Sequence, residues 1–282
     1  MFTFTISERT IDIRQVLKEN APRLYKKLPG FVFPLLRRLL HEKEVNHFLY
    51  KERDKTGVDF ATAILEDFGC KVGATGMENL PDEGRFLLCA NHPLGGLDGM
   101  AFLSQMGQWR KDLLFPVNSM LLALPPFKPV FLPVNTLQGN AGNRRLLEEA
   151  FDGPATILYF PAGKCSRKGK KGVIADLEWK KTFVTQARRS RRDIIPVHIS
   201  GRNSDFFYNL ANFRTRLGLA NIEQAFLVNE MFKLRDQEIR LTVGKPVPYR
   251  LLDNRHTDSE WAALIRRHVY RLADDPDAGF DC

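Results

Sequence analysis

The chain has 282 residues, 44% of them hydrophobic, so it can bury a sizeable core without disulfide staples. Its four cysteines include no Cys-x-x-Cys pair, which argues against metal and redox motifs and fits a reducing cytosol. A net charge of +9 favours an acidic partner, namely anionic lipid, an acidic carrier protein or nucleic acid.

Residues 8–70 are predicted to be helical, and the start of the chain lacks the apolar core of a signal peptide, which argues against export. Segment 31–41 places bulky apolar residues beside Arg37 and Arg38, a composition typical of a helix on a membrane surface. A helix packed on the core is the equal alternative. We therefore predict a helical segment, residues 1–70, that possibly faces a membrane, and an α/β domain, residues 71–282.

The run 85–90 is short, apolar and β-prone, which predicts a buried strand. A helix is predicted over 98–106, with Asp98 at or near its N-cap. Pro93, Gly95 and Gly96 lie between them and predict a tight turn that folds His92 toward Asp98. Such a pair is a candidate general base and its orienting carboxylate. The alternative is a structural histidine that caps the turn.

Segment 113–134 is long and apolar enough for a membrane span, with Lys128 as its one charge. Its five prolines argue against a continuous helix, so we predict strands at 113–117 and 128–134 around a short apolar segment. Part of it could line an acyl-chain cleft, although a plain core segment explains any single residue equally well. A helix is predicted over 144–151.

The next strand, 155–160, enters a glycine turn at 161–167 that carries Lys164 and Arg167. Backbone amides of such a turn, with cations nearby, suit an anionic headgroup. A basic loop follows at 167–172, which is either a solvated surface or a contact for phosphate or carrier protein.

Helices are predicted over 176–189, over 201–217 with Asn203 or Ser204 as cap, and over 259–272. Strands are predicted at 193–199, 223–228 and 238–243, and the tail 273–282 is expected to fray. His198 has no partner visible in the sequence and is interpreted as a packed residue. The interleaved elements predict an α/β fold with a mixed, mostly parallel sheet of about seven strands flanked by helices.

Four blocks resemble the glycerolipid acyltransferase superfamily over roughly residues 75–245, and the blocks at 91–98 and 160–166 are the specific ones. The first has five residues between His92 and Asp98 where the family has four. The second has Ala162 in place of the family's glutamate and Cys165 in place of its arginine. These features resemble the hemolysin-like branch, which includes acyltransferases similar to those of ornithine and glycine lipid synthesis.

The resemblance implies that His92 and Asp98 are catalytic and that no metal or bound cofactor is needed. It also implies substrate contacts from the two turns: Asn91, Gly95, Gly96, Phe160, Pro161, Gly163, Lys164, Ser166 and Arg167. The implied reaction moves an acyl group from an acyl-carrier-protein or coenzyme A thioester to the hydroxyl of a lyso-lipid. The acceptor would be an amino-acid lyso-lipid or a lysophospholipid.

Ordinary 1-acylglycerol-3-phosphate acylation is the first alternative. A second would use Cys165 as a nucleophile, although no motif pairs a histidine with it. A third is a non-catalytic basic protein that binds membranes or nucleic acid. Nucleic acid is not expected, because exposed aromatics do not interleave with the cations. The expected location is cytoplasmic, peripheral on the inner face of the cytoplasmic membrane.

Overall fold

The computed structural model describes residues 11–20, 22–117, 121–122, 124–133, 141–169, 171–217, 223 and 226–282. Its centre is a seven-stranded sheet in the order β1-β9-β8-β2-β5-β3-β4. The strands are β1 (Lys71–Thr75), β2 (Phe86–Ala90), β3 (Leu113–Val117), β4 (Phe131–Pro133), β5 (Thr156–Tyr159), β8 (Asp193–Ile199) and β9 (Glu238–Val243). The predicted fold class is confirmed, because only the β8–β9 pair is antiparallel.

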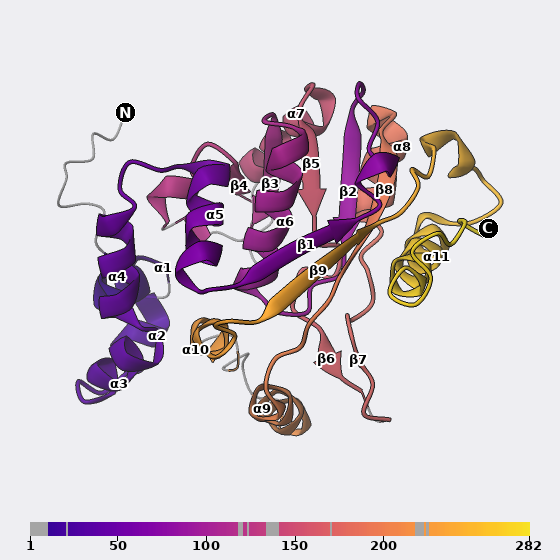
Figure 1. The fold of residues 1–282 in the computed structure, drawn as a ribbon. Helices are drawn as coiled ribbons and strands as arrows, with labels where there is room; N and C mark the ends of the chain where they lie inside the picture. Colours follow the sequence, from indigo (N-terminus) through magenta and orange to yellow (C-terminus); the bar gives the residue numbers. More distant parts are fainter. Residues whose placement is uncertain are drawn as a thin grey trace.

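Helices cover both faces of the sheet (Figure 1). Alternate residues of β2 point to opposite sides: Leu88 joins a core with α5 (Gly57–Asp67) and α6 (Gly96–Trp109). Leu87 joins a second core with α7 (Ala141–Asp152), α8 (Thr182–Ser190) and α11 (Asp258–Arg271). This burial on both faces explains why β2 reads as a continuous apolar run.

The N-terminal helices are α1 (Ile13–Asn20), α2 (Pro22–Lys27), α3 (Val32–Leu39) and α4 (Glu42–Lys51). Glu42 ties them together, since its carboxylate accepts from the Ile13 amide at 3.0 Å and pairs with Arg37. Leu49 of α4 and the apolar face of α5 enter the sheet's core. The later part of segment 1–70 therefore packs on the α/β body, and the boundary at residue 70 stays a prediction.

The short helix α10 (Leu227–Lys233) occupies a place where a strand was predicted at 223–228, and that prediction is wrong for the described residues Leu227 and Val228. A short apolar run does not distinguish a strand from a packed helix. Leu227 and Met231, one helical turn apart, lie against the positions of Gly95 and Gly96. The sheet's seventh strand is instead β1, whose sequence was not interpreted as a strand.

Two further expectations need correction. The helix predicted from residue 176 begins only at Thr182, after a loop that holds Asp176. The tail is packed rather than frayed: Ala278 is buried, Phe280 contacts Trp261, and Asp281 pairs with an α11 arginine. The two strands predicted in segment 113–134 are confirmed as β3 and β4, and Phe115, Phe127 and Phe131 lie in the core. No helix within the described residues is long and apolar enough to cross a bilayer.

Two small elements complete the end of the molecule near the glycine turn. The strands β6 (Arg167–Lys168) and β7 (Ile174–Ala175) form a hairpin from the predicted basic loop. Helix α9 (Asp205–Arg216) begins at the cap Ser204, one of the two predicted caps, whose hydroxyl accepts from the Phe207 amide. Figure 1 shows this hairpin and α9 at the lower end of the molecule.

Candidate active site

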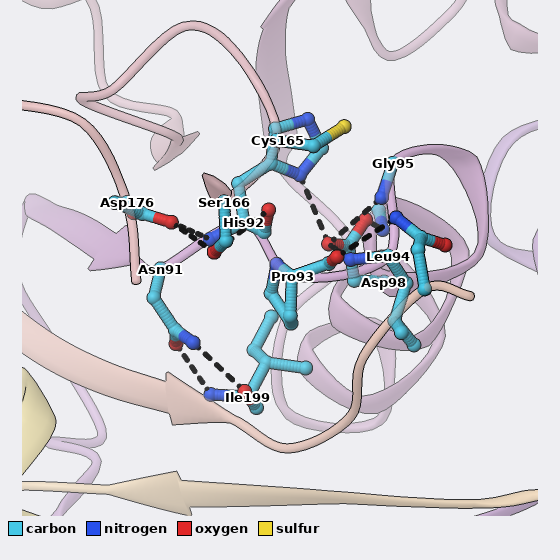
Figure 2. Close-up of polar contacts among 12 residues, drawn as sticks. Asn91, His92, Pro93, Leu94, Gly95, Asp98, Cys165, Ser166, Asp176 and Ile199 are labelled. Atoms are coloured by element: carbon cyan, nitrogen blue, oxygen red, sulfur yellow. Dashed lines mark hydrogen bonds and ion pairs between the residues drawn. The ribbon is translucent and has the colours of Figure 1, made fainter. Parts of the chain in front are cut away.

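The central strand β2 delivers His92 to the carboxyl edge of the sheet, where α/β proteins place ligands. His92 Nδ1 lies 3.0 Å from Asp98 Oδ2 (Figure 2). Asp98 is fully buried in the first turn of α6, whereas the His92 side chain is 16% exposed. The structure thus brings the two predicted catalytic residues together, with the carboxylate inside and the imidazole at the surface.

The turn between these residues is folded around the same carboxylate. Asp98 Oδ2 also accepts from the amides of Leu94 at 2.7 Å and Gly95 at 3.2 Å. Gly95 is the N-cap of α6 and Asp98 its third residue, so the bond from the Gly95 amide to the Asp98 carboxylate is the side-chain-to-N-cap half of a capping box. Gly95 has φ +86, and a Cβ there would stand 3.0 Å from Leu227 and 3.2 Å from Cys165.

The pKa of His92 reflects opposing influences. Burial lowers it, but the Asp98 carboxylate and, after it, the Cys165 thiol raise it, and the net result is a pKa well above the ordinary 6.5. The fold therefore favours the protonated form of His92 over the neutral form. Accepting a proton from a substrate requires the neutral imidazole, which Asp98 keeps in the tautomer with the proton on Nδ1.

Phe160 supplies one wall of the site. Its ring stacks on the His92 imidazole with centroids 4.0 Å apart and planes inclined by 16°. Phe102 and Phe115 pack behind Phe160 and fix its ring. Phe160 was predicted to bind substrate, and its side chain instead stacks on the His92 ring, where it limits the rotation of the imidazole.

Asp176 is a functional candidate that the sequence analysis missed. One of its oxygens accepts from the His92 amide at 3.1 Å and from the Ser166 hydroxyl at 2.6 Å, as Figure 2 shows. The other accepts from the Trp179 indole at 2.9 Å. Ser166 also donates its amide to the His92 carbonyl at 2.8 Å. The carboxylate thus joins the two motif turns, whose bonded residues His92 and Ser166 are 74 apart in the chain.

Helix α11 holds Asp176 from behind. The Asp176 amide donates to the Tyr270 hydroxyl at 2.7 Å, and Arg266 donates to the Asp176 carbonyl at 2.6 Å. In the sequence, the only local sign of this role is that Trp179, which donates to Asp176, follows it by three residues. The hydrogen bond from the His92 amide joins distant segments and leaves no local pattern.

Several predicted substrate contacts have structural partners instead. The Asn91 amide group makes two hydrogen bonds with the Ile199 backbone, at 2.7 and 2.8 Å, and so ties β2 to β8. Ser166 is occupied with His92 and Asp176. Arg167 pairs with the buried Glu223 at 2.9 Å. Their predicted roles in substrate binding remain predictions, and the observed contacts are those of positioning residues.

Arg167 belongs to a buried charged cluster. Glu223 is fully buried and also pairs with Arg214 of α9 at 2.7 Å. Burial raises the pKa of Glu223, but hydrogen bonding to Arg214 and the charge of Arg167 outweigh it and leave that pKa lowered. A buried carboxylate requires charged partners, and those of Glu223 come from two elements. Arg167 belongs to the hairpin and Arg214 to α9, so the cluster links these two elements.

The glycine turn after β5 faces outward at its tip. Pro161 is buried, while Gly163 is exposed with φ +63. Lys164 is half-buried, and no ion pair is seen for it within the described part of the chain. Exposed Lys180 brings its Nζ 3.6 Å from where a Gly163 Cβ would lie. Two cations therefore flank this turn.

Ala162 stands where the resembled family has a glutamate. It is only 5% exposed and packs in the core with Leu87 and Trp179, on the face of the sheet away from α6. A methyl group fits this apolar site, and a link between Ala162 and the choice of acceptor stays a prediction.

Cys165 lies beside the imidazole, a proximity that the sequence motifs did not reveal (Figure 2). It is 2% exposed and packs with Phe207 and Tyr208 of α9. Arg145 of α7 is exposed and pairs with Glu149. His198 packs against Tyr270 and has a pKa lowered by burial, as expected of a packed residue. The described residues contain no cluster of metal-ligating side chains.

Comparison with known proteins identifies the family of the chain. A family model described as acyltransferase matches residues 15–279. The lyso-glycine lipid O-acyltransferase of Bacteroides thetaiotaomicron is 42% identical over 265 residues, which cover 93% of this chain and 97% of that protein. The protein of the same name from Phocaeicola vulgatus is 41% identical, with coverage of 93% and 95%.

A solved structure, the 1-acyl-sn-glycerophosphate acyltransferase of Thermotoga maritima, is similar with a TM-score of 0.45 and 18% identity, covering 85% of this chain and 95% of that one. Similarity at this level adds nothing to the assignment. The family model alone spans nearly the whole sequence, and both curated relatives are matched along almost their full length. The chain belongs to the acyltransferase family.

Proposed function

We propose that this acyltransferase moves a fatty acyl group from a thioester to the free hydroxyl of a lyso-glycine lipid or a closely related amino-acid lyso-lipid. The observation that carries the proposal is the His92–Asp98 pair, in which the buried Asp98 carboxylate holds Nδ1 of the His92 ring. The acceptor class is supported by two relatives of that name that are similar along nearly their whole length.

In the proposed mechanism, His92 removes the proton from the acceptor hydroxyl as its oxygen attacks the thioester carbonyl. Asp98 stabilises the imidazolium that forms. The tetrahedral intermediate then collapses, and the carrier thiolate leaves with a proton returned by His92. The oxygen of the acceptor forms the new ester bond, and no covalent acyl-enzyme is required.

The oxyanion of that intermediate needs a backbone donor. The Gly95 amide already donates to Asp98, and the Gly163 amide donates to the Phe160 carbonyl at 3.0 Å. Of the three glycines in the two turns, Gly96 is the one whose amide has no acceptor among the described residues, and it is the first residue of the 14-residue helix α6. A free amide at a helix N-terminus is a favourable donor to a developing negative charge, which supports Gly96.

The headgroup of a glycine lipid carries a carboxylate, and Lys164 and Lys180 beside the exposed turn support binding of an anion. The thioester donor is acyl-carrier protein or acyl-coenzyme A, and the basic loop 167–172 suits the acidic surface of the first or the phosphates of the second. The proposed location is cytoplasmic, on the inner face of the cytoplasmic membrane.

The test is acyl transfer by the purified protein to lyso-glycine lipid and to lysophosphatidic acid, each with both donors. Faster acylation of lyso-glycine lipid is expected. A clear preference for lysophosphatidic acid would assign the protein to ordinary phospholipid synthesis instead.

An acyl-enzyme on Cys165 is the second candidate, favoured by the thiol beside His92. The variant Cys165→Ala separates the two mechanisms. Direct transfer predicts that it retains activity within roughly tenfold, because no bond to sulfur forms. An acyl-cysteine mechanism predicts complete loss, together with an acyl adduct on the wild-type protein in intact mass spectra.

A further inference from the structure

Helix α9 presents an apolar stripe to solvent. Phe206, Leu210, Phe213 and Leu217 recur at intervals of four, three and four residues, so they share one face of the helix. Phe206 is 52% exposed, Phe213 60% and Leu217 56%. We call these four residues the α9 stripe. A monomeric surface rarely leaves so many large apolar side chains exposed on one helix without a partner.

The opposite face of α9 covers the active site. Phe207 and Tyr208 are buried against Cys165, which lies beside His92. The Ser204 cap of α9 donates to Glu230 of α10, and α10 packs on Gly95 and Gly96. A single helix therefore separates the stripe from the catalytic turn, and whatever binds the stripe is held next to His92.

Other exposed apolar residues gather at this end of the molecule. Phe31, at the start of α3, is 79% exposed, and Leu35 is 66% exposed. Val173, at the tip of the β6–β7 hairpin, is 65% exposed. Figure 1 shows α3, α10, α9 and the hairpin together along the lower end. Three separate elements at the lower end thus carry exposed apolar residues.

The charge around the stripe is positive. Residues 164–175 contain five basic residues and no acidic one, and residues 201–217 contain three basic residues and one acidic one. Arg167 and Arg214 among them pair with the buried Glu223, and the other six basic residues outnumber the one acidic residue. Arg202 and Arg216 are exposed on α9 or next to its start. A convex apolar helix face bordered by cations matches the interface of a bilayer with anionic headgroups better than it matches a protein groove.

We propose that the α9 stripe inserts into the headgroup region of an anionic bilayer and so places His92 at the membrane surface. This inference rests on the proposed function, because a lyso-lipid acceptor resides in the membrane. It assigns to the stripe the role of bringing the active site to that acceptor, a role the sequence analysis gave only to the N-terminal helices.

The test compares Phe213→Ser/Leu217→Ser with Leu146→Ser, a control on α7 whose side chain is 45% exposed on a helix that Figure 1 shows at the upper end. Sedimentation with vesicles of phosphatidylcholine and phosphatidylglycerol measures binding. The α9 variant should bind at least roughly tenfold more weakly, since two apolar side chains leave the lipid interface. Leu146→Ser should bind like the wild type.

Activity on two forms of substrate separates this inference from the proposed function. On a short-chain lyso-lipid dissolved as monomers, the activity of the α9 variant should match that of the wild type. On vesicle-embedded lyso-lipid, its activity should fall by about the same factor as its binding.

Unchanged vesicle binding by the α9 variant would overturn the inference and leave the function intact. Loss of transfer from acyl-carrier protein with unchanged vesicle binding would overturn it in favour of a carrier-docking surface. A wild-type protein that acylates no lyso-lipid but binds vesicles through the stripe would refute the function alone.

Discussion

At His92, the Asp98 carboxylate serves two purposes. It binds the imidazole, and it also accepts the amides of Leu94 and Gly95, so the turn and the ring orientation depend on the same buried group. The longer gap between His92 and Asp98 is accommodated because the Gly95 backbone adopts a conformation with positive φ. The side chain that orients the base therefore also shapes the loop that carries it.

The first prediction concerns these two residues. His92→Ala should lower kcat/KM by at least about a thousandfold with little loss of thermal stability, because it removes the proton acceptor. Asp98→Asn should lower it by roughly a hundredfold or more, since the imidazole loses its orientation and the charge that stabilises the imidazolium. Acyl-transfer kinetics on variants shown by circular dichroism to be folded make the measurement. Near-normal turnover by folded His92→Ala would contradict the mechanism.

The second prediction concerns pH. The pKa of His92 is raised in the folded protein, so the base is neutral only above that pKa, and kcat/KM should rise with pH along a limb centred above 6.5. Asp98→Asn removes the main raising influence and should move this limb to lower pH while reducing the maximum. The same shift stabilises the fold below pH 6.5, and this stability is lost as pH rises through the folded-state pKa. A limb at the same pH in wild type and Asp98→Asn would show that another group titrates.

At the scale of elements, α10 connects parts of the molecule that lie far apart in the sequence. Asn229 and Phe232 contact His41 at the start of α4. Leu227 lies over Gly95, and Glu230 accepts from Ser204 at the start of α9. Burial raises the pKa of Glu230, but hydrogen bonds from Lys233 and Ser204 outweigh it and lower that pKa. The helix thus joins the N-terminal helices, the catalytic turn and α9.

The elements that the sequence predicted well have strong local signals. The buried strand β2, the helix α6 and the strand β8 are long apolar or amphipathic runs bounded by turn residues. The strand β1 was missed because it contains Gly73 and alternates between exposed and half-buried positions, so its conformation depends on pairing with β9. The conformation of such segments is set by tertiary contacts rather than by their local sequence.

The contacts of the site also fall into those that local spacing predicts and those that depend on distant residues. The spacing around Gly95 was enough to predict that His92 and Asp98 meet. The contacts of Asn91, Ser166 and Arg167 could not be predicted, since each partner is a distant residue that local patterns do not reveal. Asp176 was interpreted as the start of a helix. Its observed role is to accept hydrogen bonds from His92 and Ser166, which local patterns around Asp176 do not reveal.

The third prediction tests Asp176 as a positioning residue. Asp176→Ala should lower kcat with little change in KM, because it removes the support of the His92 turn without touching substrate. It should also destabilise the fold by about 1–3 kcal/mol, since three buried donors lose their acceptor. Asp176→Asn keeps one acceptor oxygen and should recover part of kcat.

Ser166→Ala is the matched control, since it removes one donor to Asp176 and leaves the bond to the His92 amide. Its kcat should fall less than that of Asp176→Ala. An equal fall in the stability of both Asp176 variants, with kcat at the wild-type level, would assign Asp176 a purely structural role. The measurements are steady-state kinetics and thermal unfolding.

At the scale of the whole molecule, charge and apolar exposure act together. The net charge of +9 attracts an anionic surface over a distance limited by salt, and the exposed side chains of α3 and α9 can enter the interface once the protein arrives. Charge attraction to the membrane depends on salt, whereas insertion of apolar side chains does not. Experiments at several salt concentrations therefore separate the two contributions.

The last prediction is that membrane association is peripheral and depends on salt. Binding to vesicles containing phosphatidylglycerol should weaken roughly tenfold or more between low salt and about 0.5 M salt, because the Debye length shortens and the basic surface is screened. The variant Phe31→Ser/Leu35→Ser should weaken binding further at every salt concentration, since it removes two exposed side chains of the predicted membrane-facing segment. These substitutions are a cleaner test than deletion of residues 1–50, which would also remove the buried Leu49. Protein that leaves the membrane only with detergent and ignores salt would show that apolar insertion, rather than charge, holds it there.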